Sequence, residues 1–147
     1  MDFAEYVRSL AADLFSLLAP ESGRVQLDLD VGEVSLDLER AIPCGLVLNE
    51  LVSNALEHAF PAGRRGTVRL SLRNEAPGEL RMTVGDDGVG LPAGLDCAHA
   101  DSLGLQLVAA LVGQLNGRLD VRRDGGTTFE VRFPTHPAGS GEGVGGK

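Results

Sequence analysis

The apolar residues of the chain recur at two different spacings, and the wider one predicts helices. Residues 2–18 carry apolar side chains three and four positions apart, which is typical of an amphipathic helix. A second helix is expected over about 42–60, with Pro43 near its first turn, where proline is tolerated. A third, mostly apolar helix is expected over 103–115 and is closed by Asn116-Gly117.

Strict alternation of apolar and polar residues predicts the strands. Residues 24–31 alternate, and Gly32 and Glu33 are expected to turn the chain into a second alternating strand at 34–38. Two hairpins follow from four further segments, 67–74 with 79–86 and 118–123 with 127–133. The resulting order, α-β-β-α-β-β-α-β-β, predicts an α+β fold in which a sheet and helices form a two-layer sandwich.

Length and charge narrow the possible functions. The 147 residues fit one domain, and the formal net charge of −8 disfavours binding to nucleic acid or to an anionic membrane, since both need a basic surface. The sequence contains no run of about 18 apolar residues, so no membrane span is expected. The two cysteines, Cys44 and Cys97, have no zinc-site spacing, and a reduced, cytoplasmic setting is expected.

The helix that contains LNELVSNALEHAF, residues 48–60, carries the first candidate chemistry. Glu50, Asn54 and His58 lie four residues apart and therefore share one edge of the helix. A carboxylate and an amide oxygen one turn apart can hold Mg²⁺, which prefers oxygen ligands and keeps several waters. The alternative is an ordinary solvated helix face.

The segment GDDGVGLP, residues 85–92, directly follows a predicted strand. Asp86 at the strand end could accept a hydrogen bond from an exocyclic amine such as that of adenine. Gly88 and Gly90 allow close approach of a ligand to the backbone. The alternative is a simple acidic turn.

Two further segments could face a nucleotide. In SLGLQLV, residues 102–108, Gly104 lies at a helix start, where free backbone N–H groups attract phosphate. In DGGTTF, residues 124–129, the hydroxyl of Thr127 could face a nucleotide. The alternative for Gly104 is a loop glycine before a core helix, and the alternative for DGGTTF is an ordinary hairpin turn.

The order of these four segments resembles that of the GHKL ATP-binding proteins, which include gyrase-type topoisomerases, a heat-shock chaperone, mismatch-repair ATPases and histidine kinases. NELVSNALEHAF matches their N-box, DDGVG their DxGxG motif, SLGLQLV the second glycine box and GGTTF the last box. With LDLERAIPCGLVLNELVSNALEHAF as context, residues 2–134 look like the catalytic domain of a two-component sensor histidine kinase of the HWE-like group. The resemblance implies the Bergerat fold, with a mixed, mostly antiparallel sheet packed against helices.

The resemblance also implies roles for individual residues. Asn54 matches the ligand of the Mg²⁺ that is bound to the ATP phosphates. Glu50 matches the acid/base position of the wider superfamily, and the alternative for a kinase is that it orders Mg²⁺ or polarises the acceptor imidazole. Asp86 matches the aspartate that binds the adenine amino group, and residues 92–102 match the ATP lid. The full set expected to bind ATP is Asn54, Ala55, His58, Asp86, Gly88, Gly90, Leu91, Leu103, Gly104, Leu105 and Thr127.

Two departures from the family pattern shape the functional prediction. Glu57 stands where many relatives have lysine, and no histidine of this chain lies in a dimerisation helix. The lead hypothesis is therefore an excised catalytic domain (23–134) with its N-terminal linker helix (1–22) and a disordered glycine-rich tail (135–147). It would transfer the γ-phosphoryl group of ATP to a histidine on a dimerisation domain outside this chain, for later passage to a response regulator. The fragment itself is expected to be a monomer.

Two alternatives stay open at this point. Glu57 and His58 also resemble the stand-alone anti-sigma-factor serine kinases of the same superfamily. A nucleotide-binding module without catalytic activity is the second alternative.

Overall fold

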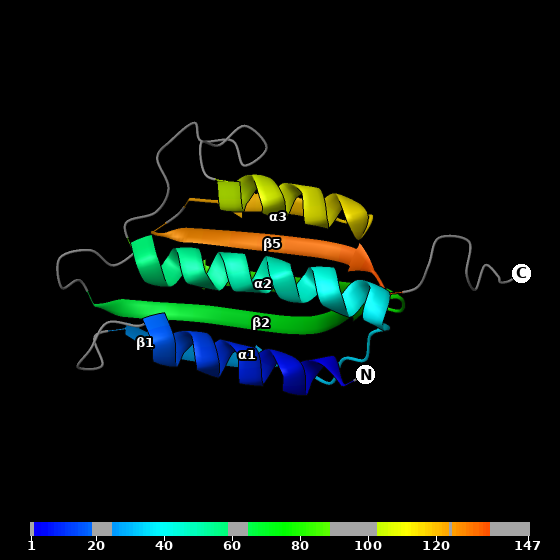
Figure 1. Ribbon diagram of the computed structural model, residues 1–147, viewed down its shortest axis with the longest axis horizontal. Coiled ribbons are helices and arrows are strands. Elements are labelled where there is room, and N and C mark those ends of the chain that lie inside the picture. Colours follow the sequence, from blue (N-terminus) through cyan, green and yellow to red (C-terminus); the bar gives the residue numbers. More distant parts are fainter. Residues whose placement is uncertain (1, 19–24, 59–64, 89–102, 124, 136–147) are drawn as a thin grey trace, which may run out of the picture.

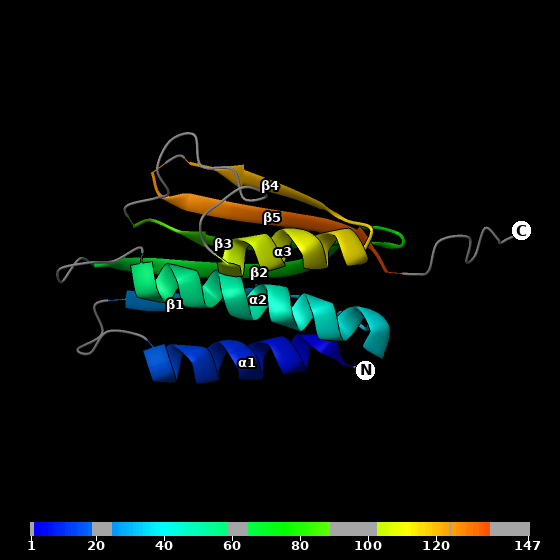
Figure 2. The same cartoon turned by 45° about the horizontal axis from the view of Figure 1, so that its top comes forward.

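The protein has two layers, helices on one side and a five-stranded sheet on the other. The computed structural model describes residues 2–18, 25–58, 65–88, 103–123 and 125–135. The helices cover one face of the sheet (Figure 1), and the turned view separates the two layers (Figure 2). The elements are α1 (Phe3–Leu18), β1 (Val25–Val31), α2 (Leu38–His58), β2 (Gly66–Ala76), β3 (Glu79–Asp86), α3 (Leu103–Gln114), β4 (Arg118–Arg122) and β5 (Thr127–Pro134). The predicted two-layer α+β sandwich is confirmed.

The sheet has the strand order β1-β2-β3-β5-β4. β1 and β2 are parallel and are joined through α2, whereas β2–β3, β3–β5 and β4–β5 are antiparallel pairs. Both predicted hairpins, β2–β3 and β4–β5, are therefore present, and the sheet is mixed and mostly antiparallel as expected.

The prediction of a second strand at 34–38 is wrong. Ser35 makes only an isolated antiparallel bridge with Asp2, and the backbone N–H of Phe3 donates to the carbonyl of Val34 over 3.0 Å. Val34 and Leu36 alternate because both are buried at the base of the helix layer, not because they line a strand. Alternation of apolar and polar residues shows only that every second side chain is buried. A short connecting segment can have this pattern as well as a strand.

The second helix begins at Leu38, four residues earlier than predicted. Asp37 acts as its N-cap, because its carboxylate Oδ1 accepts a hydrogen bond from the backbone N–H of Arg40 over 3.0 Å. The buried Arg40 side chain bonds back to Asp37 over 3.0 Å and donates from Nε to the carbonyl of Pro134 over 3.1 Å. The start of α2 is thereby tied to the end of β5.

The core lies between the helix layer and one face of the sheet. Every second residue of the central strands points into it, as a half-buried sheet requires. The Cys44 thiol is also buried there, 3.8 Å from the sulfur of Met82, and burial raises its pKa well above the ordinary value. The strand residues of this core are Val68, Leu70, Leu72, Leu80, Met82, Val84, Phe129, Val131 and Phe133.

In the described part of the chain, no helix is both long and apolar enough to cross a membrane.

The other face of the sheet, which we call the bare face because no described helix packs on it, carries charge. Glu130 is its best-buried acid, with 8% of its side chain exposed. It accepts a hydrogen bond from Nε of Arg81 and lies 3.7 Å from Arg122 and 3.6 Å from Arg132. Burial alone raises the pKa of Glu130, but the Arg81 hydrogen bond and the three guanidinium charges outweigh it and hold the pKa below its ordinary value.

We expect this cluster to make stability depend on pH. Since the folded-state pKa of Glu130 is lowered, its contribution is fully present above the ordinary value of 4.5 and is lost as pH falls through the folded-state pKa. Glu130→Gln should lower the free energy of unfolding by about 1–3 kcal/mol at pH 7. Urea unfolding at pH 7 and at pH 3 measures this, and a deficit that does not shrink at the lower pH would contradict it.

Candidate functional site

The four predicted motif segments meet at one end of the molecule. The C-terminal half of α2 and the start of β5 lie on the left in Figure 1, and α3 begins toward the same side. The end of β3 lies beside the start of β5, because Asp86 is paired with Thr127. β3 and β5 are hydrogen-bonded neighbours, and α2 packs against α3. Segments far apart in the sequence are thus brought to one place by the topology of the sheet.

On α2, the two polar residues of the predicted catalytic row are accessible. Glu50 and Asn54 are both partly exposed and lie one turn apart, which is a rise of about 6 Å. Neither side chain has a hydrogen bond or an ion pair with any other described residue. Ala55 is buried in the core and Glu57 is exposed. His58 is the last residue of α2, and its side chain lies outside the described part.

On the sheet, Asp86 and Thr127 form a cross-strand pair. Asp86 is the last residue of β3, and its register partner is Thr127, the first residue of β5. Because side chains alternate along a strand, Asp86 shares the helix-facing side with Val84, and Thr127 shares it with Phe129. Asp86 Oδ1 accepts a hydrogen bond from the backbone N–H of Gly88 over 2.9 Å, while Thr127 is buried.

Two further residues hold the backbone beside Asp86: Gly126, which lies in the last-box segment that sequence analysis matched to the nucleotide site, and Asp87, to which it gave no role. Gly126 has φ of +134°, and a Cβ atom at this position would lie 2.0 Å from the Asp86 carbonyl oxygen. Asp87 accepts a hydrogen bond from the backbone N–H of Thr67 over 2.8 Å. The Gly-Gly pair in a predicted turn and the second of two adjacent acids were the available signals, but both are common in ordinary turns.

On α3, Gly104 is the second residue of the helix, as predicted, and Leu105 is buried in the core. The N-terminal end of α3 carries the positive end of the helix dipole, which suits it to an anion. Leu103 begins the helix, but its side chain lies outside the described part. Gly90, Leu91 and the expected lid at 92–102 also lie outside the described residues.

These donors fit Mg²⁺ only if the metal keeps other ligands. Glu50 and Asn54 offer one carboxylate and one amide, and the described residues contain no group of three His, Cys, Asp or Glu placed to hold a metal. Mg²⁺ is commonly bound through one or two protein oxygens, with water and phosphate oxygens completing its shell. The donor set therefore suits a metal that arrives with a phosphorylated ligand.

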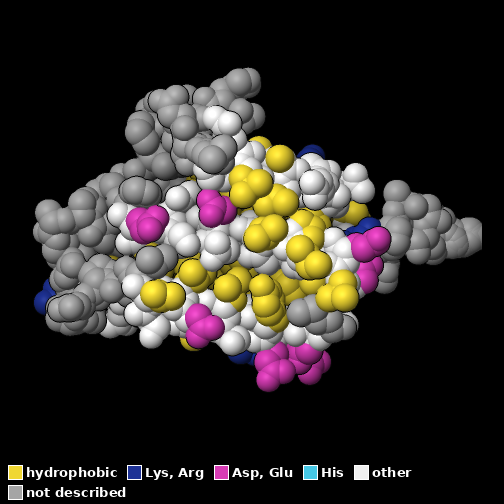
Figure 3. Space-filling view, viewed as in Figure 1, with side chains coloured by type: hydrophobic (Ala, Val, Ile, Leu, Met, Phe, Trp, Pro, Cys, Tyr) yellow, Lys and Arg dark blue, Asp and Glu magenta, His cyan; other side chains and the backbone are white. Residues whose placement is uncertain are grey.

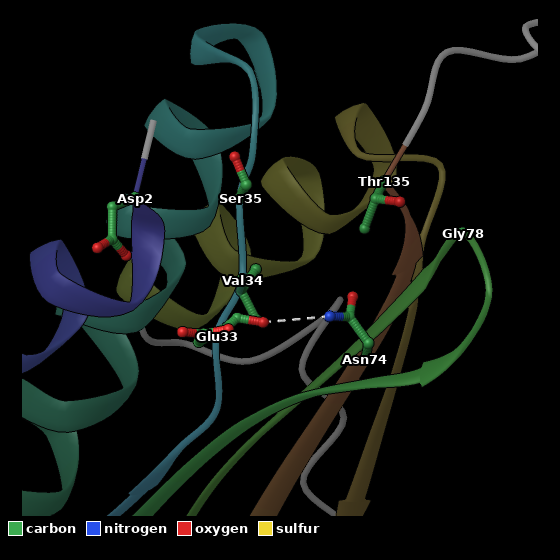
Figure 4. A pocket seen from close by; sticks show the side chains of 7 residues that line it. All are labelled: Asp2, Glu33, Val34, Ser35, Asn74, Gly78 and Thr135. Carbon is green, nitrogen blue, oxygen red and sulfur yellow. Dashed lines mark hydrogen bonds between the residues drawn. The ribbon is translucent and has the colours of Figure 1, made fainter.

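A hollow of about 570 Å³ lies at the opposite end of the sheet. Figure 4 shows Asn74 donating to the backbone carbonyl of Glu33, over 3.2 Å, across its floor. Two acids, Asp2 and Glu33, are among the described residues that line this hollow, and none of those residues is basic. The described lining is therefore poorly suited to phosphate.

Comparison with protein families gives a match over much of the chain. The family model described as "Histidine kinase-, DNA gyrase B-, and HSP90-like ATPase" matches residues 39–137. The sensor histidine kinase PdtaS of Mycobacterium tuberculosis is 44% identical over 109 residues, which cover 71% of this chain and 22% of PdtaS. Blue-light-activated histidine kinase 2 of Erythrobacter litoralis is 34% identical over 76% of this chain and 33% of that protein. The chain thus spans a third or less of these relatives.

Solved structures show the same arrangement of elements. The histidine kinase domain of the blue-light activated histidine kinase EL346 from Erythrobacter litoralis superposes with a TM-score of 0.85 and 29% identity, over 92% of this chain and 62% of that one. The catalytic domain of histidine kinase ThkA has a TM-score of 0.75 over 95% of this chain and 97% of its own, at 18% identity. The second likeness concerns the fold alone.

We predict that Gly126 is needed for β5 to pack closely against the backbone of Asp86. Gly126→Ala places a methyl group against the Asp86 carbonyl, so β5 must move away from β3, and we expect a loss of more than about 2 kcal/mol of unfolding free energy. Gly125→Ala is the matched control, because Gly125 also has a positive φ, of +68°, but open space around it. It should cost about 1 kcal/mol. Urea unfolding compares the two, and equal losses would contradict the steric argument.

Proposed function

Because the chain belongs to the family of histidine kinase-, DNA gyrase B- and HSP90-like ATPases, we propose that it is the catalytic domain of a sensor histidine kinase. It would bind ATP with Mg²⁺ and transfer the γ-phosphoryl group to a histidine on a dimerisation domain outside this chain. The observation that carries the proposal is the convergence of α2, β3, α3 and β5 at one end, with accessible oxygens on α2 and a carboxylate at the end of β3. The similarity to PdtaS and to the EL346 kinase domain supports the histidine kinase class.

Asp86 would bind the adenine ring. A carboxylate has only acceptors, so it pairs with the donor N–H₂ of adenine and not with the carbonyl of guanine. Its Oδ1 already accepts from Gly88, which holds the carboxylate in place, and each carboxylate oxygen retains further lone pairs. Thr127, its cross-strand partner, would add a hydroxyl beside the base, and Ala55, Leu91 and Leu105 would supply apolar contacts.

Asn54 and the start of α3 would hold the phosphates. Asn54 would provide an oxygen ligand to Mg²⁺, and the metal would neutralise charge on the phosphate oxygens. Gly104 would let the phosphates approach the N-terminal end of α3, where the helix dipole favours an anion. His58 and Leu103 flank these positions in the sequence. The exposed Glu57 can keep its charge in solvent, away from the phosphates, which makes the absence of the lysine found in many relatives tolerable.

Glu50 would orient the histidine that accepts the phosphoryl group. An imidazole that donates one ring N–H to this carboxylate presents its other nitrogen, with its lone pair, to the γ-phosphorus. A phosphorus–nitrogen bond then forms as the bond to the bridging oxygen breaks, and ADP leaves with that electron pair. Positioning and charge neutralisation supply most of the catalysis in such transfers. A response regulator would then take the phosphoryl group from the histidine, in the cytoplasm.

The nucleotide assignment predicts which single changes abolish binding. Asp86→Asn replaces an acceptor with a donor facing the adenine amine, and Asn54→Ala removes the metal ligand, so each should weaken binding of a non-hydrolysable ATP analogue by about tenfold or more. Asp120→Asn on the bare face is the matched control and should bind like the unaltered chain. Calorimetry with Mg²⁺ measures this, and unchanged affinity in both site variants would refute the site.

The transfer reaction predicts a phosphoryl group that is lost in acid. We would replace the matched region of M. tuberculosis PdtaS with this chain and incubate the chimera with radiolabelled ATP and Mg²⁺. Label on histidine should be lost in acid and retained in base, whereas label on serine survives acid. Acid-stable label would instead favour the serine-kinase alternative. Nucleotide binding without any labelling would favour a non-catalytic module.

A further inference from the structure

Three large aliphatic side chains lie exposed in a row on α2. Leu38, Ile42 and Leu46 are 64%, 61% and 46% exposed and follow one another at four-residue spacing; we refer to them as the α2 stripe. Tyr6 of α1 lies close to this part of α2, because a Cβ atom at Gly45 would be only 3.0 Å from its ring. Figure 3 shows hydrophobic side chains gathered over this side of the helix layer.

The α2 stripe is not needed for the core of the domain. The opposite side of the same helix already buries Val47, Leu48 and Leu51 against the sheet. A surface helix of a two-layer fold normally presents polar residues outward, and single exposed leucines need no explanation. Three in succession on one helix, beside an exposed tyrosine, form a patch of the kind that marks an interaction site.

The charges around the α2 stripe favour a basic partner over a second copy of this chain. Asp37 and Glu39, next to Leu38, are exposed, and so is Glu5, next to Tyr6. The neighbouring Arg40 is buried and already bonded to Asp37 and Pro134. Two copies meeting through this surface would bring like charges together, whereas lysine or arginine at the edge of a partner would complement them.

The α2 stripe also runs toward the proposed site. Glu50 and Asn54 continue the same four-residue spacing after Leu46, and each step advances about 6 Å along the helix while turning about 40° around it. The row accordingly passes from exposed residues to the partly exposed Glu50 and Asn54. The near end of a helix that lies along the α2 stripe would therefore meet Glu50, one turn beyond Leu46, whereas Asn54 lies a further 40° around α2.

We propose that the α2 stripe docks the phosphoacceptor region, through a helix whose apolar face is bordered by lysine or arginine. This inference rests on the proposed function, and it deepens it by naming the surface that guides the acceptor histidine to ATP. A patch of three or four side chains is too small for a stable complex of separate molecules. It suffices when both parts belong to one protein, because a linker gives an effective concentration in the millimolar range. The small share of PdtaS that this chain spans, 22%, is consistent with such a linked partner.

The PdtaS chimera tests the docking surface directly. Ile42→Ser combined with Leu46→Ser removes the apolar contact at exposed positions, so the fold should persist, as thermal unfolding would verify. We expect the rate of histidine labelling to fall about tenfold or more, with the affinity for the ATP analogue unchanged. The control is Leu17→Ser, which alters an even more exposed leucine of α1, at 79%, and should label at the original rate.

A second variant tests the expected chemistry of the partner. Glu39→Lys reverses one charge beside the α2 stripe and should slow labelling, while Glu39→Gln should slow it less. Equal rates in both variants and in the unaltered chimera would overturn the assignment of a basic partner.

The experimental outcomes distinguish failure of the docking inference from failure of the proposed function. Unchanged labelling in the Ile42/Leu46 double variant overturns docking and leaves the proposed function standing. A chimera that binds the ATP analogue but is never labelled refutes the proposed function, and the docking inference falls with it. If the double variant loses nucleotide affinity in proportion to its labelling rate, the α2 stripe supports the nucleotide site and not the acceptor, which also overturns docking.

Discussion

The register between β3 and β5 is the constraint on which the candidate site depends. It sets Asp86 opposite Thr127 and brings Gly126 against the Asp86 backbone. A slip of one residue would turn Asp86 to the bare, charged face and expose Met82 and Val84, so the burial of the central strands enforces the register. The hydrophobic core thus positions a polar residue that is itself only partly buried.

Sequence patterns predicted the layers, the helices and both hairpins, because each produces a local signal of period two or near 3.6. They could not predict that β1 pairs with β2 in parallel, since that depends on where α2 returns the chain. The segment 34–38 was misread because Val34 and Leu36 alternate without a strand partner. The early start of α2 follows from the capping carboxylate of Asp37, which the helical spacing of the apolar residues does not reveal.

For the site, order along the chain was more informative than any single motif. Asp86, Asn54, Gly104 and Thr127 each had an ordinary structural reading, but their succession resembles one family, and the family match confirms that resemblance. Sequence reasoning gave Asp87 no role and placed Gly126 only within the last box, and both residues act through backbone contacts between strands. Such contacts leave no trace in hydrophobic periodicity. The roles of the individual site residues remain predictions for the binding experiments.

Both ends of the described chain lie far from the candidate site. Asp2 is bridged to Ser35, just before α2 begins, and Pro134 is held to Arg40 in the first turn of α2. The polar residues of the site lie on the other half of the same 21-residue helix, which is about 30 Å long. The length of α2 therefore sets the distance between these terminal contacts and the candidate site. A phosphoacceptor helix that docks on the α2 stripe would therefore contact the domain between these two terminal anchors and the proposed place of transfer.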